Sequence, residues 1–281
     1  MHPTVQEIAQ ALQAAELLSA AFIDSGQNNL VLDAGDLIVR VPRHDEARRD
    51  LAREAGILAV LAPRLPWPVP APQLRSVGAH VVAVHRKVAG EPLLSLAGMT
   101  DKQKLELARD LALFLRALHA MPVELLPAAA ATDTMAEWRE LRDKLDAKAL
   151  PLLPADTGAA IRARFDRFLG NGHDTPRAII HGDFGTGNVL VHNGQVSGVI
   201  DFAGCGEGDP AYDLASLSAG LGDDLLALMV PHYPGIATMR DRIAFYRSTF
   251  PLLDVLFGLD HGDAAALEAG LRSLTGGDVQ G

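Results

Sequence analysis

A polar, glycine-rich loop near the middle of the chain is the feature that most restricts how this sequence can fold. The loop runs from His181 to Asn188 and lies between the apolar runs 178–180 and 189–191. A further apolar run, 196–200, follows the turn Asn193-Gly194 and ends at Asp201. Asn-Gly between two strand-like runs is a strong hairpin signal. The hairpin is therefore expected to bring Asp201 back to the loop that contains Asn188.

The side chains at these positions suit phosphoryl transfer. That reaction needs a carboxylate to orient and deprotonate the attacking hydroxyl, and oxygen ligands to hold Mg²⁺ against the phosphates. We expect Asp183 to be the carboxylate, and Asn188 and Asp201 to be the ligands. The spacing of Asp183 and Asn188 matches the H-R-D-x-x-x-x-N loop of kinases. The alternative is a pair of solvated loop aspartates beside a capped turn.

The rest of the chain predicts an α+β fold in two parts. Strands are expected at 30–32, 37–41 and 81–84, and helices at 5–22, 46–61, 101–119 and 155–169, with mostly helix after 211. This distribution places a small β-rich lobe with one intercalated helix at 1–88. A larger helical lobe with the polar loop occupies 89–281.

Charge and cysteine content limit the possible partners. The formal net charge of −10 disfavours binding to phosphate backbones, so no nucleic-acid partner is expected. Cys205 is the only cysteine, which rules out an intrachain disulfide and fits a reducing cytosol. The N-terminus does not resemble a signal peptide, and no apolar stretch is long enough to span a bilayer. We therefore expect a cytoplasmic protein with no membrane partner.

The polar loop resembles the signature of the aminoglycoside phosphotransferase superfamily, which includes aminoglycoside, macrolide and choline-type kinases. The typical form is H-G-D-x-x-x-x-N-x-L followed by I-D-[FW], and residues 208–215 resemble the G-D-P-x-x-D-L-A run that comes next. The chain is most similar in appearance to the aminoglycoside 2″-phosphotransferase and macrolide-kinase branches. The resemblance implies a protein-kinase-like bilobal fold. It also implies Asp183 as catalytic base, Asn188 and Asp201 as Mg²⁺ ligands, and His181 and Asp213 as braces of the loop.

A nucleotide site is expected in the small lobe, for ATP or GTP as phosphate donor. Gly26 lies in a turn where family members place a phosphate-covering loop, although an ordinary turn is the alternative. Arg40 stands where kinases have a lysine that grips the phosphates, with Glu54 as its partner. Arginine keeps the charge and can bind phosphate in a bidentate way. Arg86 and Val88 belong to the connector that is expected to offer backbone groups to the purine.

The acceptor is a small molecule with a hydroxyl group, and three hypotheses remain open. The first is an aminoglycoside antibiotic, whose positive charge Asp223 and Asp224 could contact, although both could equally begin a helix. The second is a macrolide or another small metabolite, which Arg40 and the thin acidic run after Asp213 favour. The third is a nucleotide-binding regulatory protein without transferase activity. The oligomeric state is not indicated by any sequence feature.

Overall fold

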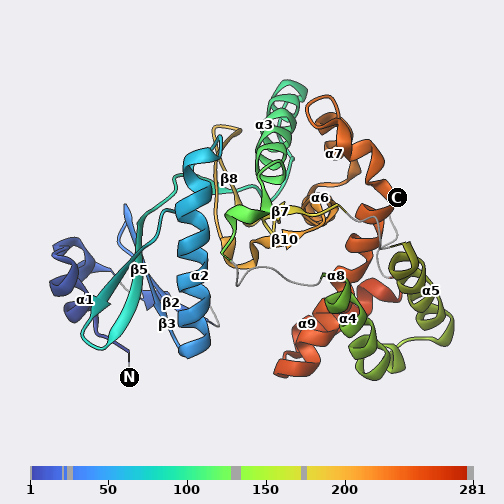
Figure 1. The fold of residues 1–281 in the computed structure, drawn as a ribbon, viewed down its shortest axis with the longest axis horizontal. Coiled ribbons are helices and arrows are strands. Elements are labelled where there is room, and N and C mark those ends of the chain that lie inside the picture. The colour runs from blue at the N-terminus through green and yellow to red at the C-terminus, as the bar shows by residue number, and fades with distance from the viewer. Residues whose placement is uncertain (1, 21, 24–27, 128–133, 172–175, 277–281) are drawn as a thin grey trace.

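The computed structural model describes residues 2–20, 22–23, 28–127, 134–171 and 176–276 (Figure 1). The helices are α1 (Val5–Leu12), α2 (Asp45–Leu61), α3 (Asp101–His119), α4 (Thr134–Lys148), α5 (Ala155–Asn171), α6 (Pro210–Leu221), α7 (Asp223–Met229), α8 (Arg240–His261) and α9 (Ala264–Leu274). The strands are β1 (Phe22–Ile23), β2 (Asn29–Asp33), β3 (Leu37–Pro42), β4 (Gln73–Val77), β5 (His80–Arg86), β6 (Glu91–Pro92), β7 (Ala178–Ile180), β8 (Val189–His192), β9 (Gln195–Val199) and β10 (Gly206–Gly208).

The N-terminal part is built on an antiparallel sheet with the strand order β1-β2-β3-β5-β4. Alternate side chains of β2 and β3, such as Leu32 and Val39, point into a small core that α1 closes with Ile8. Helix α2 runs along this sheet on the side that faces the rest of the molecule (Figure 1). Its last turns bury Ile57, Leu58 and Leu61 in the larger core of the C-terminal part. Helix α2 therefore contacts the N-terminal sheet and also contributes to the core of the C-terminal part.

The polar loop lies between two small sheets. Strand β7 leads into the loop and pairs with β10, while β8 leads out of it and pairs with β9 and β6. The β8–β9 hairpin closes with Asn193 and Gly194, whose φ angles of 52° and 77° are those of the tight turn that Asn-Gly favours. The predicted hairpin is therefore confirmed.

The C-terminal part is helical around the buried helix α6. Its core is rich in aromatic side chains: the ring of Trp138 on α4 lies 5.2 Å from that of Tyr246 on α8 and 6.2 Å from that of Tyr212 on α6. Burial of these large rings stabilises the packing of α4, α6 and α8 against one another. None of the helices in the described part of the chain has the length and apolar character needed to cross a bilayer.

The α+β organisation is confirmed, with local differences that include the N-terminus and strand β4. The single helix predicted over 5–22 is wrong, because α1 ends at Leu12, where Gln13 turns into the left-handed region at φ 53°. A short 3₁₀ helix, Ala15–Ser19, and strand β1 follow. Strand β4 was not predicted, since its mostly exposed residues carry no alternation of apolar and polar side chains. The division into lobes after residue 88 stays a prediction.

Candidate active site

The polar loop holds its side chains by hydrogen bonds within the loop. The amide Nδ2 of Asn188 donates to Oδ2 of Asp183 at 2.8 Å and to the backbone carbonyl of Asp183 at 2.9 Å. The backbone N–H of Asp183 donates to Nδ1 of His181 at 3.2 Å, so Nε2 carries the ring hydrogen and donates to the carbonyl of Ile200 at 3.0 Å. His181 is fully buried, whereas Asp183 is exposed. These hydrogen bonds orient the accessible carboxylate of Asp183 and tie its backbone to the buried His181.

Asp213 fixes the start of the loop from α6. Its two carboxylate oxygens accept the backbone N–H groups of His181 and Gly182 at 2.8 and 2.9 Å. Oδ2 also lies 3.0 Å from Nε2 of His119, the last residue of α3. Asp213 is fully buried, so these donors replace the water it loses. His181 and Asp213 thus lie where a bracing role requires them.

Asp201 follows β9 and has a left-handed backbone, with φ 64° and ψ 71°. The preceding residue, Ile200, donates its N–H to the backbone carbonyl of Asn188 at 2.9 Å, which places Asp201 near the end of the loop. Carboxylate and amide oxygens are the donors that Mg²⁺ prefers. In the described residues no group of three or more His, Cys, Asp or Glu could hold a metal. Two protein ligands, completed by phosphates and water, fit Mg²⁺, which is usually bound in that way.

Three of the predicted nucleotide residues line one cleft of ≈ 830 Å³ between the N-terminal sheet and the β8–β9 hairpin. Its walls include Arg40, Glu54, Val88 and Asp201. Nη1 of Arg40 lies 2.8 Å from both carboxylate oxygens of Glu54, which is buried. The predicted Arg40–Glu54 contact is therefore present, and within the described part of the chain it uses only the Nη1 group of the guanidinium.

Two other predicted nucleotide residues are placed differently. Arg86 ends β5 with an exposed side chain and does not line the cleft, although its neighbours His85 and Lys87 do. Gly26 lies outside the described residues. The cleft also contains Asn29, which the sequence did not single out. Its Oδ1 is buried and has no hydrogen-bond partner within the described part of the chain.

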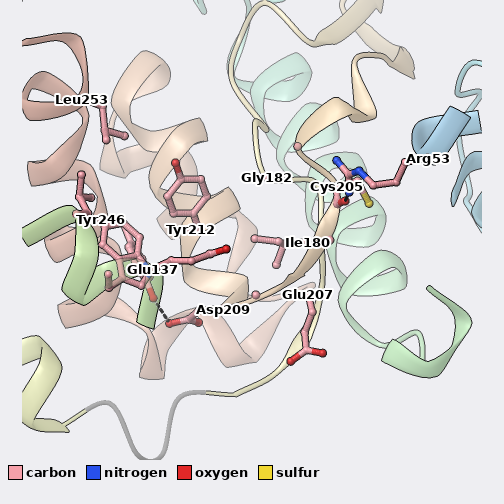
Figure 2. A pocket seen from close by; sticks show the side chains of 15 residues that line it. Arg53, Glu137, Ile180, Gly182, Cys205, Glu207, Asp209, Tyr212, Tyr246 and Leu253 are labelled. Atoms are coloured by element: carbon pink, nitrogen blue, oxygen red, sulfur yellow. Dashed lines mark hydrogen bonds between the residues drawn. The ribbon is translucent and has the colours of Figure 1, made fainter. Parts of the chain in front are cut away.

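A second cavity of ≈ 530 Å³ includes Gly182 of the loop in its lining (Figure 2). The backbone of Gly182 and residues 204–208 form one wall, and Trp138, Tyr212 and Tyr246 form another. Burial raises the pKa of the Tyr212 hydroxyl to about 12, so at neutral pH it is a neutral donor. The cavity combines aromatic surface with polar groups. Gly182, the residue before Asp183, is part of its lining.

Sequence reasoning missed a buried polar group in this cavity. Asp209 accepts hydrogen bonds from Nε of Arg242 at 2.7 Å and from the Tyr246 hydroxyl at 3.0 Å, the second of which is drawn in Figure 2. It also caps α6 by accepting the N–H of Ala211. The G-D-P phrase points to such a cap, but no local pattern identifies partners more than 30 residues away.

The two acids proposed for a cationic acceptor lie elsewhere. Asp223 and Asp224 form the first turn of α7 and line a pocket of ≈ 320 Å³ against α8. Oδ1 of Asp223 lies 2.7 Å from Nη1 of Arg247, and Arg240 lines the same pocket. The negative charge of Asp223 is therefore paired already. Gly220, near the end of α6, is packed closely against Thr186 of the loop, where a Cβ atom would have no room.

Comparison with known sequences identifies relatives over most of the chain. Residues 19–246 match the phosphotransferase enzyme family. Viomycin phosphotransferase of Streptomyces vinaceus is 28% identical over 283 residues, which cover 95% of this chain and 97% of that enzyme. Homoserine kinase of Neisseria meningitidis is 43% identical over 70 residues, 25% of this chain and 23% of that protein.

Solved structures of similar fold are also known. The GDP and kanamycin complex of APH(2″)-IIIa superposes with a TM-score of 0.86 and 22% identity, covering 96% of both chains. Macrolide 2′-phosphotransferase MphH of Brachybacterium faecium has a TM-score of 0.70 and 24% identity, covering 99% of this chain and 100% of the other. The shared fold confirms the kinase-like α+β fold expected from the sequence.

Proposed function

Because the chain belongs to the phosphotransferase enzyme family and is a small-molecule kinase, we propose that it moves the γ-phosphate of ATP or GTP onto a hydroxyl of an antibiotic, with Mg²⁺ as cofactor. The observation that carries this proposal is the Asn188–Asp183 hydrogen bond, in a loop that adjoins both the cleft of Asp201 and the aromatic cavity. The non-catalytic regulatory hypothesis is set aside.

In the proposed reaction Asp183 orients the acceptor hydroxyl and accepts its proton as the phosphoryl group is transferred. The amide of Asn188 holds Asp183 in place through Nδ2, and its Oδ1 would bind Mg²⁺ together with the carboxylate of Asp201. Mg²⁺, when bound, neutralises charge on the phosphate oxygens. Arg40, held by Glu54, would contact the phosphates with its remaining N–H groups. Val88 lines the cleft where the base of the nucleotide would lie.

We place the acceptor in the cavity beside Gly182, because Gly182 directly precedes Asp183 and the cavity has an aromatic wall. An aminoglycoside is our first candidate, in keeping with the acidic balance of the chain. A viomycin-type antibiotic is the second candidate, favoured by the relative that is similar over nearly the full length of both chains. A macrolide remains a third, since the Asp223–Arg247 pair neutralises one of the two acids at the start of α7.

The test is a panel assay with the purified protein. Kanamycin, viomycin and a macrolide are each incubated with Mg²⁺ and either ATP or GTP, and products are weighed by mass spectrometry. Gain of one phosphoryl group on one compound identifies acceptor and donor together, and Asp183→Asn should remove the product. Absence of a phosphorylated product with every compound and both nucleotides would reject the antibiotic assignment.

A further inference from the structure

Arg53, on α2, is the one side chain of the described residues that lines both the nucleotide cleft and the aromatic cavity. Its guanidinium donates through Nη1 to the backbone carbonyl of Cys205 at 2.9 Å and through Nη2 to the carbonyl of Ala203. Figure 2 shows Arg53 reaching Cys205 from the helix on the far side of the cavity. These bonds connect the N-terminal part of the molecule with the segment that directly follows Asp201.

Arg53 lies directly before Glu54 on α2. Neighbouring residues of an α-helix point about 100° apart, so Arg53 and Glu54 face different partners from adjacent positions. Glu54 holds Arg40 of β3, and Arg53 holds residues 203–205. A displacement of α2 would therefore disturb the Arg40 site and the Asp201 segment together.

The backbone of Asp201 needs such support. A left-handed conformation at a residue other than glycine is strained and persists only where the surrounding structure holds it. Within the segment, the N–H of Cys205 donates to Phe202 at 3.0 Å, and the N–H of Ala203 lies 3.4 Å from Oδ1 of Asp201. The second of these is long, and the charged guanidinium of Arg53 adds two further hydrogen bonds to the segment.

We propose that Arg53 is a positioning residue, which holds the strained segment 201–205 against α2 so that the carboxylate of Asp201 keeps the orientation required for binding the metal–nucleotide complex. The metal part of this inference rests on the proposed function; the positioning of the segment does not. Arg53 touches neither nucleotide nor acceptor in this role. It acts through the two carbonyls that its guanidinium contacts.

The test compares Arg53→Met, which keeps an unbranched apolar stem without the donors, with Arg53→Lys and with a control. The control is Arg49→Met, because Arg49 is an exposed residue one turn earlier on α2 and lines neither cavity. Calorimetry measures ATP affinity without Mg²⁺ and with increasing Mg²⁺. We expect Arg53→Met to bind ATP alone like the wild type, but to need about tenfold more Mg²⁺ for its tight binding. Arg53→Lys, with one ammonium group, should show a smaller effect, and the control none.

Hydrogen exchange provides a readout that is independent of metal and activity. The backbone amides of 202–206 should exchange about tenfold faster in Arg53→Met, while those of β2 and β3 keep the wild-type rate. Unchanged exchange in this segment would overturn the proposal, as would loss of ATP affinity to the same degree with and without Mg²⁺. If the wild type itself shows no Mg²⁺-dependent affinity, the proposed function fails, and the exchange experiment still decides the role of Arg53. If Arg53→Met does not fold, Arg53→Lys decides by the same two measurements.

Discussion

The side-chain amide of Asn188 lies 2.8 Å from the carboxylate of Asp183 and donates a hydrogen bond to it. One end of Asn188 thus orients the proposed base, and the other end, Oδ1, is directed away from that bond. A kinase must hold the acceptor hydroxyl and the phosphate-bound metal at a fixed separation. Asn188 would help to set that separation, because it orients Asp183 and would bind the metal through Oδ1.

Asp183→Asn removes the proposed base with almost no change of shape. We expect kcat to fall roughly 10²–10⁴-fold, the usual contribution of a positioned base, while the affinity for nucleotide stays the same. Steady-state kinetics with the acceptor found in the panel assay, and calorimetry with ATP or GTP, measure the two quantities. An unchanged kcat would mean that Asp183 is not the base.

Gly182→Ala should destabilise the loop and abolish activity. Gly182 has φ +80°, and a Cβ atom at this position would collide with the backbone carbonyl of Gly204. We expect a loss of at least about 1–3 kcal/mol in the free energy of unfolding from the backbone strain alone. Gly187→Ala is the matched control, because it lies in the same loop with open space around its Cα. Denaturant titration of both variants checks the difference, and equal stability would contradict the close contact.

Arg40→Met should lower both stability and nucleotide affinity. It leaves the carboxylate of Glu54, which is 1% exposed, without its partner. Breaking a buried pair on one side costs about 3–5 kcal/mol. The double variant Arg40→Met with Glu54→Gln should regain much of the stability but none of the affinity. Thermal unfolding and calorimetry separate the two effects; recovery of affinity in the double variant would remove Arg40 from the nucleotide site.

Stability should depend on the protonation of His85 in the nucleotide cleft. Burial lowers the pKa of His85 below its usual value, opposed by the hydrogen bond with the carbonyl of Arg86 and helped by the charge of Arg40. The folded protein therefore takes up the proton less readily than the unfolded chain. The stability that comes from burying neutral His85 is fully present above the unfolded pKa of about 6.5. It is lost as the pH falls from there toward the lowered folded pKa.

His85→Gln removes this titration. Between about pH 5 and 8, the melting temperature of the wild type should fall more steeply on acidification than that of the variant. His192→Gln is the control, since His192 is exposed at the end of β8. Parallel curves for the wild type and His85→Gln would exclude His85 as the source of the pH dependence.

Much of the site could be predicted because its signals are local. The Asn193-Gly194 turn sets the pairing of β8 and β9, and that pairing returns Asp201 to the loop of Asp183 and Asn188. The periodic apolar residues of α3 predicted that helix with the bounds that the structure has, Asp101–His119. These features depend on backbone preferences and on side-chain spacing within a few residues.

The tertiary structure alone decided which distant groups meet. Arg53 bonds to carbonyls 150 and 152 residues away, and its place on α2 looks like that of any solvated arginine in the sequence. The charge of Asp223 is paired by Arg247 only because the fold brings α7 and α8 to the same pocket. The Asp209–Tyr246 bond likewise forms where α6 and α8 cross. Residue type and spacing determined the loop and its chemistry. The packing of helices determined which charges are paired, because contacts between distant segments leave no periodic pattern in the sequence.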